Sequence, residues 1–390
     1  MKIGVVTFWD GNENYGMLLQ CWAFQRFLKL EGHEPFVIRT KPDTYKSLSR
    51  RIIEYGTPYF ILRYFYRKYL FLRNYRAELK KKKIINLRNF EGFRCRHLKF
   101  SKNTYNSLKS IQQNPPQADA YIVGSDQVWS QTLDNPNNQM YFLNFGEDKV
   151  QRIAFAPSFG MLTYPDFLTE TLKICLQRFK ALSVREYAGV EICKKLGYNA
   201  EKVLDPTLLL DKEQYIELMQ SSKNKEFENF VFVYCLNITS AEDIKWDNLK
   251  HFSQDNSYSV IVTPGKGYMD SQELFGSNEV VYNYSSLEQW LFNIYKSELV
   301  VTTSFHGIVL SILLEKPFVF VPLQGQFAHT NNRVIDLLKD LDLTNRILLD
   351  GMTYSDVVQS NIDWFNIKAK LEKYKISSIK YLKEYLIENV

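Results

Sequence analysis

The first forty residues carry a strand, a glycine-containing loop, a helix and a second strand in immediate succession. The apolar run KIGVVTF spans residues 2–8, the loop GNENYG follows, and MLLQCWAFQRFLKLEG repeats its apolar residues with a period near 3.6 until Gly32. PFVIRT then resumes as a strand. Because two strands joined by a helix pair in parallel through a right-handed crossover, this order predicts an α/β fold. The loop lies at the carboxyl end of the first strand, where open parallel sheets bind ligands.

Strands and helices continue to alternate along the rest of the chain. We expect strands in AYIVGSDQVW, in RIAFAPSFG at 152–160 and in ALSVRE at 181–186, and a helix in YAGVEICKKLG. A second set begins at Phe230 with VFVYCL, SVIVTP, VVYNY, a helix around Leu287 to Tyr295, ELVVTTSFHG and KPFVFVP. Both sets predict doubly wound parallel sheets with helices on their faces.

The length of 390 residues exceeds the size at which a single hydrophobic core usually divides, so we expect two domains. We assign residues 1–206 to an N-terminal Rossmann-like domain and residues 207–350 to a C-terminal Rossmann-like domain. Residues 351–390 are expected to form helices that pack back on the domains. The tail after Asn361 contains no glycine or proline and still carries apolar side chains to bury.

The composition excludes several classes of protein. With 45% hydrophobic and 24% charged residues, the chain is neither disordered nor a multi-span membrane protein. The five cysteines lack a CxxC pair and the five histidines lack HxH or HExxH spacing, so neither a disulfide framework nor a bound metal is expected. No GxGxxG fingerprint indicates a redox cofactor. The N-terminus lacks the charged lead and long apolar stretch of a signal peptide, which favours a cytoplasmic protein.

Positive charge is concentrated in residues 46–102, which hold 17 Lys and Arg against three Glu. Between Arg50 and Lys83 the basic residues interleave with aromatic ones, nine of which lie between Tyr55 and Tyr75. Such a stretch suits a lipid surface, because Lys and Arg meet lipid phosphates while Tyr and Phe lie at the headgroup level. Charge interrupts it too often for it to span a bilayer. The alternative is a basic helix hairpin packed on its own domain, and composition favours the two interpretations equally.

The segment VVTTSFHGIVLSILLEKPFVFVP, at residues 300–322, ends an apolar strand in a polar turn and continues as an apolar helix. Thr303, Ser304 and Gly307 lie where the unpaired amides and the macrodipole of the helix start favour an anion. His306 in the same turn can act as a general acid or base near neutral pH. The segment therefore predicts a phosphate or carboxylate site. In the alternative interpretation, Ser304 only caps the helix and His306 is a rim residue.

Other polar residues also lie at expected strand ends. Arg185, in SVRE, can bind a carboxylate or phosphate through its planar fork, or it can form an ion pair with Glu186. In GSDQVW, Ser125 and Asp126 can bond a sugar on which Trp129 stacks, or Trp129 can be a core residue beside a helix cap. Four residues of the first loop can line the facing cleft or form a turn only: Asn12, Asn14, Tyr15 and Gly16.

Taken in order, these segments resemble the polysaccharide pyruvyl transferase family. The matching segments are NYGMLLQCWAFQRFL, ADAYIVGSDQVWS, YFLNF with RIAFAPSFG, LSVRE with GVEICKKLG, VLDPTLLL, VVTTSFHGIVLSILLEKPF and NNRVIDLLKDLDL. Seven segments in the same order are more specific than any single motif. Residues 46–102 and the far C-terminus lie outside the pattern. We expect residues 46–102 to be an insertion in the first domain. The resemblance implies two Rossmann-like domains facing one another across a cleft, similar to the glycosyltransferase B (GT-B) arrangement.

The resemblance also implies a reaction, in which phosphoenolpyruvate as co-substrate gives its pyruvyl group to a hexose as a cyclic ketal, without a cofactor or a metal. The residues expected to be catalytic are His306, Arg185 and Glu186. The residues expected to bind the donor are Ser304, Gly307, Thr303, Arg185 and Arg333. The residues expected to bind the acceptor are Asn14, Tyr15, Gly16, Ser125, Asp126 and Trp129.

Family members commonly act in the cytosol on lipid-linked or nucleotide-linked intermediates of surface glycans. The acceptor is therefore expected to be a sugar on a polyprenyl diphosphate, a precursor of exopolysaccharide or capsule. Contact of residues 50–83 with the inner face of the cytoplasmic membrane would fit such a lipid-linked acceptor. No nucleic acid partner is expected. Two other functions stay open: a glycosyltransferase that uses a nucleotide-sugar donor in the same two-domain cleft, and a noncatalytic membrane-associated subunit of glycan assembly.

Overall fold

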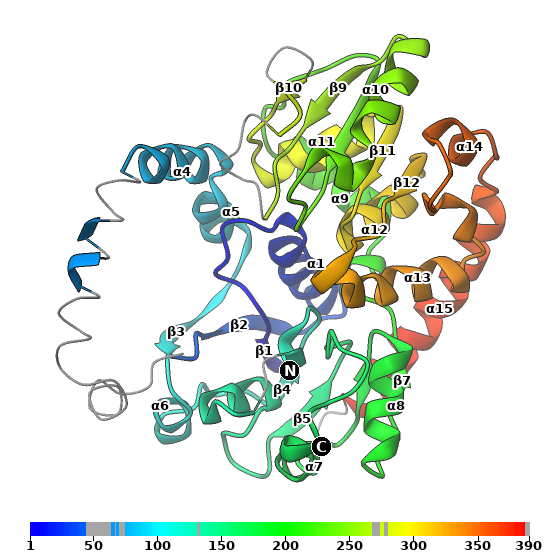
Figure 1. Cartoon of the computed structure of the whole chain (residues 1–390). Helices are drawn as coiled ribbons and strands as arrows, with labels where there is room; N and C mark the ends of the chain where they lie inside the picture. The colour runs from blue at the N-terminus through cyan, green and yellow to red at the C-terminus, as the bar shows by residue number, and fades with distance from the viewer. Residues whose placement is uncertain are drawn as a thin grey trace.

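The structure is a computed structural model that describes residues 1–43, 64–66, 68–69, 75–130, 133–266, 274–276 and 280–386. Each half of the chain is built around a five-stranded parallel sheet, and the two sheets lie in the lower and upper parts of Figure 1. In both sheets the first strand of that half lies at the centre, flanked on one side by the next two strands and on the other by the last two.

The first sheet has the order β3-β2-β1-β4-β5. Its strands are β1 (Lys2–Val6), β2 (Glu34–Thr40), β3 (Phe100–Tyr105), β4 (Ala120–Val123) and β5 (Gln151–Ala154). The backbone N–H of Ala154 donates to the carbonyl of Ala181, which brings a short parallel pair, β6 (Ser183–Val184) and β7 (Glu201–Lys202), beside the edge at β5. The helices of this half include α1 (Tyr15–Leu30), α6 (Leu108–Gln113), α7 (Thr169–Leu176) and α8 (Tyr187–Lys195). All residues of β4 are buried, as expected for a central parallel strand covered on both faces.

The second sheet has the order β10-β9-β8-β11-β12. Its strands are β8 (Phe230–Tyr234), β9 (Ser259–Val262), β10 (Val281–Tyr282), β11 (Leu299–Thr302) and β12 (Phe318–Phe320). Its helices are α9 (Lys212–Gln220), α10 (Trp246–Asp255), α11 (Leu287–Lys296), α12 (Phe305–Leu313), α13 (Asn332–Asp340) and α14 (Tyr354–Val358). Short 3-10 helices lie at Val128–Ser130, Pro136–Phe142, Asp166–Leu168, Pro206–Leu208, Ala241–Ile244, Gly325–Asn331 and Thr344–Arg346.

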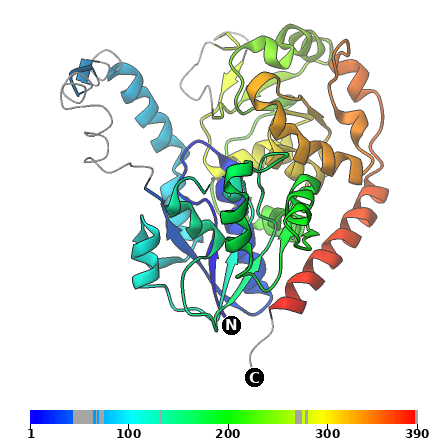
Figure 2. The same cartoon turned by 60° about the horizontal axis from the view of Figure 1, so that its bottom comes forward.

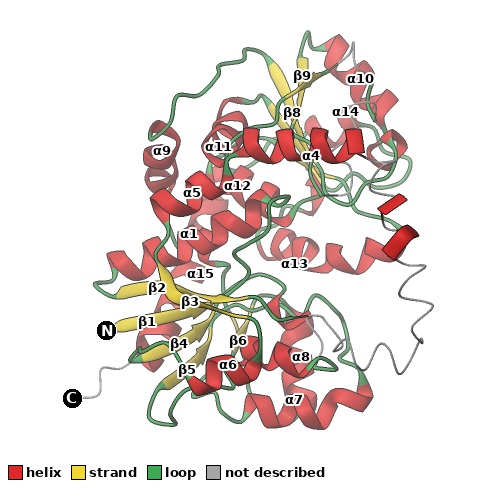
Figure 3. Ribbon diagram, turned by 90° about the vertical axis from the view of Figure 1, so that its left-hand side faces the viewer, coloured by secondary structure: helices red, strands yellow, loops and turns green. Residues whose placement is uncertain are grey.

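In each sheet the strand order reverses beside the central strand, and open α/β sheets bind ligands at such a point. The predicted fold class, an α/β protein of two Rossmann-like units similar to the glycosyltransferase B arrangement, is therefore confirmed. Figure 3 shows α1, α12 and α13 in the layer between the two sheets. The domain limits at residues 206 and 350 stay a prediction.

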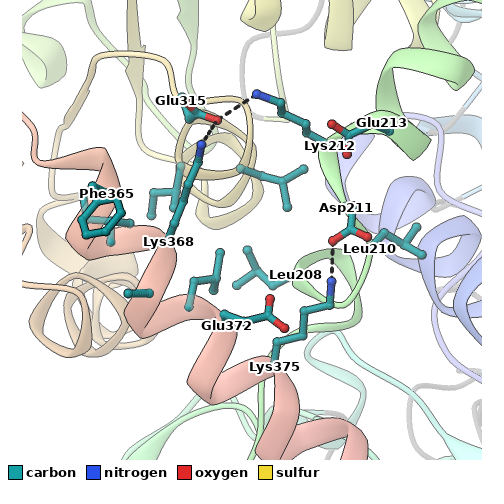
Figure 4. Close-up of a pocket in the computed structure, with 15 residues that line it drawn as sticks. Leu208, Leu210, Asp211, Lys212, Glu213, Glu315, Phe365, Lys368, Glu372 and Lys375 are labelled. Carbon is teal, nitrogen blue, oxygen red and sulfur yellow. Dashed lines mark hydrogen bonds and ion pairs between the residues drawn. The ribbon is translucent and has the colours of Figure 1, made fainter.

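The long C-terminal helix, α15 (Trp364–Tyr385), runs along both halves of the molecule (Figure 2). Near its start, Lys368 forms an ion pair with Glu315 at the end of α12 (2.8 Å), at a groove between α15 and the second half (Figure 4). Near its end, the hydroxyl of Tyr381 donates to the carbonyl of Ala154 in the first sheet (3.2 Å). The helix therefore ties the two halves together.

The basic segment contains the helices α4 (Tyr75–Arg88) and α5 (Phe90–His97), and α4 projects from the body in Figure 1. Arg88 is fully buried and donates to the backbone carbonyls of Asn12 and Pro264, which belong to different halves. Phe93 of α5 is buried in the core. Residues 84–97 thus pack on the protein. Part of the aromatic stretch that we assigned to a lipid surface lies outside the described residues, and its described aromatic residues, Tyr64, Phe65, Tyr66, Tyr69 and Tyr75, are exposed.

The limits of the predicted insertion, residues 46–102, need a correction at their C-terminal end. β3 begins at Phe100 and pairs with β2, so the last residues of the segment belong to the first sheet. The strand lies at the sheet edge and exposes Lys102, Asn103 and Thr104, and it therefore lacks the apolar pattern by which the other strands are predicted. No helix in the described ranges is both long enough and apolar enough to cross a membrane.

Candidate active site

Polar residues that are far apart in the sequence meet where strands of both halves end. Parallel strands direct their carboxyl ends to one edge of a sheet, so the residues that follow them gather there. We call seven of these residues the polar cluster: Ser125 and Asp126 after β4, Arg185 and Glu186 after β6, Asp205 after β7, His306 in the first turn of α12 and Arg333 in the first turn of α13.

Asp205 lies at the centre of the polar cluster, and its side chain has no exposed surface. Its Oδ2 atom accepts hydrogen bonds from Nη1 of Arg185 (2.7 Å) and from the hydroxyl of Ser125, and it lies 3.7 Å from Nε2 of His306. Its Oδ1 atom accepts from the N–H (3.0 Å) and the hydroxyl (2.6 Å) of Thr207. Burial acts to raise the pKa of Asp205, but its contacts with His306 and Arg185 hold that pKa well below its ordinary value. The charged carboxylate therefore lies between the guanidinium and the imidazole.

The guanidinium of Arg185 is buried, yet only one of its nitrogens is paired. Its central carbon lies 4.5 Å from the centre of the Phe305 ring, and Nε lies 4.0 Å from Oε2 of Glu186, beyond hydrogen-bond distance. Within the described part of the chain, Nε and Nη2 have no hydrogen-bond partner. Burial acts to lower the pKa of Arg185, but the carboxylates of Asp205 and Glu186 outweigh it and the pKa is raised. A charged, buried guanidinium with free N–H groups is suited to bind a carboxylate or a phosphate.

Arg333 packs against the same aromatic ring, with its guanidinium carbon 5.7 Å from the centre of Phe305. Its Nε atom is buried and unpaired among the described residues. Burial and the positive charge of Arg185 lower the pKa of Arg333 to about 10, so that the side chain stays charged at neutral pH. Two guanidiniums held on one ring repel each other, and an anion bound to both would relieve that repulsion. This pair is the strongest indication of an anion site.

The imidazole of His306 is 5% exposed and lies in the first turn of α12. Its Nε2 atom has no hydrogen-bond partner within the described residues. Gly16, at the start of α1, lies directly against the ring, because a Cβ atom there would be 2.3 Å from Nδ1. The start of α1 therefore packs closely against the imidazole. Gly16, which we assigned to the acceptor, thus lies beside the predicted acid.

The polar turn before α12 is occupied by bonds within the protein. Ser304 is the N-cap residue, and its hydroxyl accepts from the N–H of Gly307 (3.4 Å), as the capping interpretation expected. The hydroxyl of Thr303 accepts from the N–H of Leu236 (2.7 Å) and donates to its carbonyl (3.0 Å). Thr303 therefore joins the ends of β11 and β8. Its hydroxyl is therefore already paired within the protein, and its role in donor binding stays a prediction.

Two aromatic residues that we assigned to the acceptor lie in the core. Trp129 has no exposed surface, stacks on Phe142 with ring centres 5.2 Å apart, and donates from Nε1 to the carbonyl of Tyr141 (3.0 Å). Tyr15 is equally buried, and its hydroxyl donates to the carbonyl of Ser285 (2.6 Å). Neither ring has a free face for a sugar, so the structure argues against the predicted roles of both residues. Their positions match the core interpretation instead.

The remaining predicted acceptor residues have mixed surroundings. The side chain of Asn14 caps α1 by accepting from the N–H of Met17 (3.3 Å). Ser125 contacts Arg185 (3.1 Å) as well as Asp205, and it is fully buried. Asp126 is held at a φ of 85°, beside the charges of the cluster. Ser125 and Asp126 therefore lie with the predicted donor residues.

Asp205 is the member of the polar cluster that the sequence prediction missed. It lies in VLDPTLLL, a segment that carries the family resemblance, and Asp-Pro-Thr is typical of a helix cap. The residue does cap the 3-10 helix Pro206–Leu208. β7 (Glu201–Lys202), the strand that precedes Asp205, is only two residues long and was not expected from the sequence, so no predicted strand end pointed to this acid.

In the part of the chain that the structure describes, no three His, Cys, Asp or Glu side chains are grouped so that they could hold a metal ion. The expectation that the protein needs no metal and no cofactor stays a prediction.

Comparison with known proteins identifies one family. Residues 14–324 match the family described as polysaccharide pyruvyl transferase. No curated protein matches the chain significantly. Solved structures with a similar fold include UDP-GlcNAc 2-epimerase from Neisseria meningitidis bound to UDP-GlcNAc (10% identity, TM-score 0.46, 97% of this chain and 94% of that chain). They also include Acinetobacter baumannii MurG (9% identity, TM-score 0.41, 97% of this chain and 94% of that chain). A third is Arabidopsis thaliana UGT89C1 (11% identity, TM-score 0.46, 98% of this chain and 98% of that chain).

Proposed function

We propose that this chain, which belongs to the polysaccharide pyruvyl transferase family, moves the pyruvyl group of phosphoenolpyruvate onto a hexose of a surface polysaccharide precursor. The product is a cyclic ketal, and phosphate is released. The observation that carries the proposal is a pair of guanidiniums on one aromatic ring, that of buried Arg185 and that of partly buried Arg333, which hold unpaired N–H groups beside Phe305, the chain neighbour of His306. Phosphoenolpyruvate carries a carboxylate and a phosphate on one small carbon frame, and such a doubly anionic donor complements two guanidiniums.

The donor would be bound by the unpaired nitrogens of the two arginines, Nε and Nη2 of Arg185 and Nε of Arg333. Two charged contacts restrict the freedom of the reacting carbon and so lower the barrier. His306 gives a proton from Nε2 to the methylene carbon C3, which becomes a methyl group, and C2 becomes electrophilic.

The sugar then supplies two hydroxyl groups in turn. The first hydroxyl oxygen bonds to C2, and its proton passes to Oε2 of Glu186, an oxygen that has no partner among the described residues. The C2–O bond to phosphate breaks, and a neighbouring hydroxyl bonds to C2 and closes the ketal ring. The proton of this second hydroxyl leaves with the phosphate, and the proton on Glu186 returns to His306 through solvent. The reaction balances without an oxidant or a reductant.

The acceptor that we propose is a hexose on a polyprenyl diphosphate at the inner face of the cytoplasmic membrane. Support comes from the composition of residues 50–83, where Lys and Arg alternate with aromatic residues. On α4, Lys82, Lys83 and Leu87 are exposed.

Calorimetric titration of the full chain with phosphoenolpyruvate tests the donor. We expect the wild type to bind, and Arg185→Lys and Arg333→Lys to weaken binding by about 10-fold to 100-fold, since each loses a charge-assisted hydrogen bond worth about 1.5–3 kcal/mol. Arg178→Lys serves as a control, because Arg178 pairs with exposed Asp148 away from the cluster. A wild type that does not bind, or two variants with unchanged affinity, would contradict the proposal. Release of a nucleoside diphosphate from a nucleotide sugar, in place of phosphate from phosphoenolpyruvate, would support a glycosyltransferase.

A further inference from the structure

The helix α13 carries three charged residues on one side, and the first of them belongs to the polar cluster. Arg333, Asp336 and Asp340 are three and four residues apart, a spacing that places them along one side of a helix. Val334 and Leu338, on the opposite side, are buried in the core, and α13 contacts α12 of its own half. The charged side is therefore available to contact the first half.

The two acids of α13 bind the turn that follows Arg185. Oδ2 of Asp336 accepts from the backbone N–H of Tyr187 (3.2 Å), the first residue of α8. Asp340 accepts from the hydroxyl of Tyr187 (3.2 Å) and from the ammonium of Lys202 in β7, which also lies 3.8 Å from the centre of the Tyr187 ring. The side chains of Lys202 and Asp340 are only 19% and 13% exposed, so water screens their ion pair less than one on the open surface.

These contacts lie beside two groups that repel each other. Arg185 belongs to the first half and Arg333 to the second, and both guanidiniums lie against the ring of Phe305. Their like charges act to separate the two halves at this place. Tyr187 lies two residues after Arg185, and Arg333 is in the first turn of the helix that binds Tyr187. The contacts of the two acids therefore oppose the repulsion where it arises.

We propose that Asp340 is a positioning residue for anion binding. By holding the turn after Arg185 against α13, it keeps Arg333 close enough to Arg185 for one small anion to contact both. The proposal rests on the proposed function in taking phosphoenolpyruvate as that anion. The sign of the effect separates positioning from charge alone. Removing an acid would strengthen anion binding through its charge, whereas losing the position of a guanidinium weakens it.

Calorimetric titration with phosphoenolpyruvate of four full-length proteins tests this role: wild type, Asp340→Ala, Arg333→Ala and the double variant. We expect Asp340→Ala alone to weaken binding by about 3-fold to 10-fold, as for residues of one contact network. In the Arg333→Ala background the same change should alter binding by less than about 2-fold, because no second guanidinium remains to be positioned.

The control is Glu217→Ala, which removes the acid of another ion pair between the halves, Arg26–Glu217 (3.0 Å). Arg26 lies ten residues along α1 from Gly16, the residue beside His306, so this variant should keep the wild-type affinity. Chemical unfolding of each sample checks that it is folded. Asp340→Asn, which keeps an acceptor for the Tyr187 hydroxyl, takes the place of an Ala variant that does not fold.

Equal affinity of the wild type and Asp340→Ala would overturn the assignment. So would tighter binding by Asp340→Ala, or an equal loss with and without Arg333, since that effect would not pass through the second guanidinium. Failure of the proposed function gives a different pattern, in which phosphoenolpyruvate does not bind the wild type at all.

The same four proteins titrated with inorganic phosphate then test Asp340 by itself. Phosphate affinity that Asp340→Ala lowers only when Arg333 is present supports the positioning role. Equal phosphate affinity in the wild type and Asp340→Ala, or no phosphate binding by the wild type, overturns it.

Discussion

Replacement of Asp205 by Asn tests whether one buried carboxylate positions both the guanidinium and the imidazole. The amide keeps the volume of the side chain but turns one acceptor into a donor. In one orientation its NH₂ group faces Nη1 of Arg185, and in the other it faces the N–H of Thr207, both of which are donors. Removing one partner of a buried ion pair costs about 3–5 kcal/mol. We expect the free energy of unfolding to fall by about 3 kcal/mol, the low end, because Asn retains one carbonyl oxygen.

The same substitution should separate kcat from KM. Without the carboxylate, the imidazole of His306 loses the charged acceptor that lies 3.7 Å from its Nε2 atom and positions it for proton transfer. General acid catalysis is worth about 100-fold to 10,000-fold in rate, so kcat should fall by at least about 100-fold. The free nitrogens of Arg185 still carry their charge, and KM for phosphoenolpyruvate should change little.

Phosphate release from phosphoenolpyruvate in the presence of a methyl hexoside, measured over a range of donor concentrations, gives both constants. Chemical unfolding of the same samples shows that the variant is folded. The control is Asp211→Asn, which makes the same change at an exposed acid that pairs with Lys375. A folded Asp205→Asn protein that keeps the wild-type kcat would refute the positioning role.

Four further predictions follow from the same contacts. The pKa of Asp205 in the folded protein lies well below 3.8, so its carboxylate stabilises the fold above about pH 4 and loses this contribution as the pH falls toward the folded-state pKa. The difference in unfolding free energy between wild type and Asp205→Asn should therefore shrink from pH 7 to pH 3. A constant difference would contradict this. His306→Ala should abolish phosphate release while the unfolding midpoint stays near that of the wild type, and a near-normal rate would remove His306 from the acid role. Gly16→Ala should lower kcat because the added Cβ would lie 2.3 Å from Nδ1 of His306, and an unchanged kcat would show that the ring needs no such fixed position. Trp129→Phe should lower the free energy of unfolding by about 1 kcal/mol through the lost bond to the Tyr141 carbonyl without changing KM for the hexoside, and a raised KM would return Trp129 to the acceptor site.

The order of strands and helices could be predicted from the sequence because most strands are buried on both faces and appear as short apolar runs. The strand lengths were less predictable. RIAFAPSFG was expected to be a strand over residues 152–160, but β5 ends at Ala154, and Ala156 takes a positive φ of 59° that an extended strand does not allow. β3 was missed because an edge strand with polar side chains gives no apolar signal.

The meeting of Arg185 with His306 was predictable in outline, because each follows an expected parallel strand and the family resemblance implies two domains that face each other across one cleft. The distance between them was not predictable, since it depends on how the two sheets face each other. The role of a buried aromatic residue was also hidden in the sequence. Trp129 follows a polar loop that begins at Gly124, as a sugar-stacking residue could, and only its packing on Phe142 distinguishes the two roles.

A crystal structure of the protein soaked with phosphoenolpyruvate measures the central claim most directly. Our account predicts that carboxylate and phosphate oxygens lie within hydrogen-bond distance of Nε and Nη2 of Arg185 and of Nε of Arg333, with the methylene carbon facing Nε2 of His306. Phosphoenolpyruvate bound at another place, or bound here with its methylene turned away from His306, would contradict it.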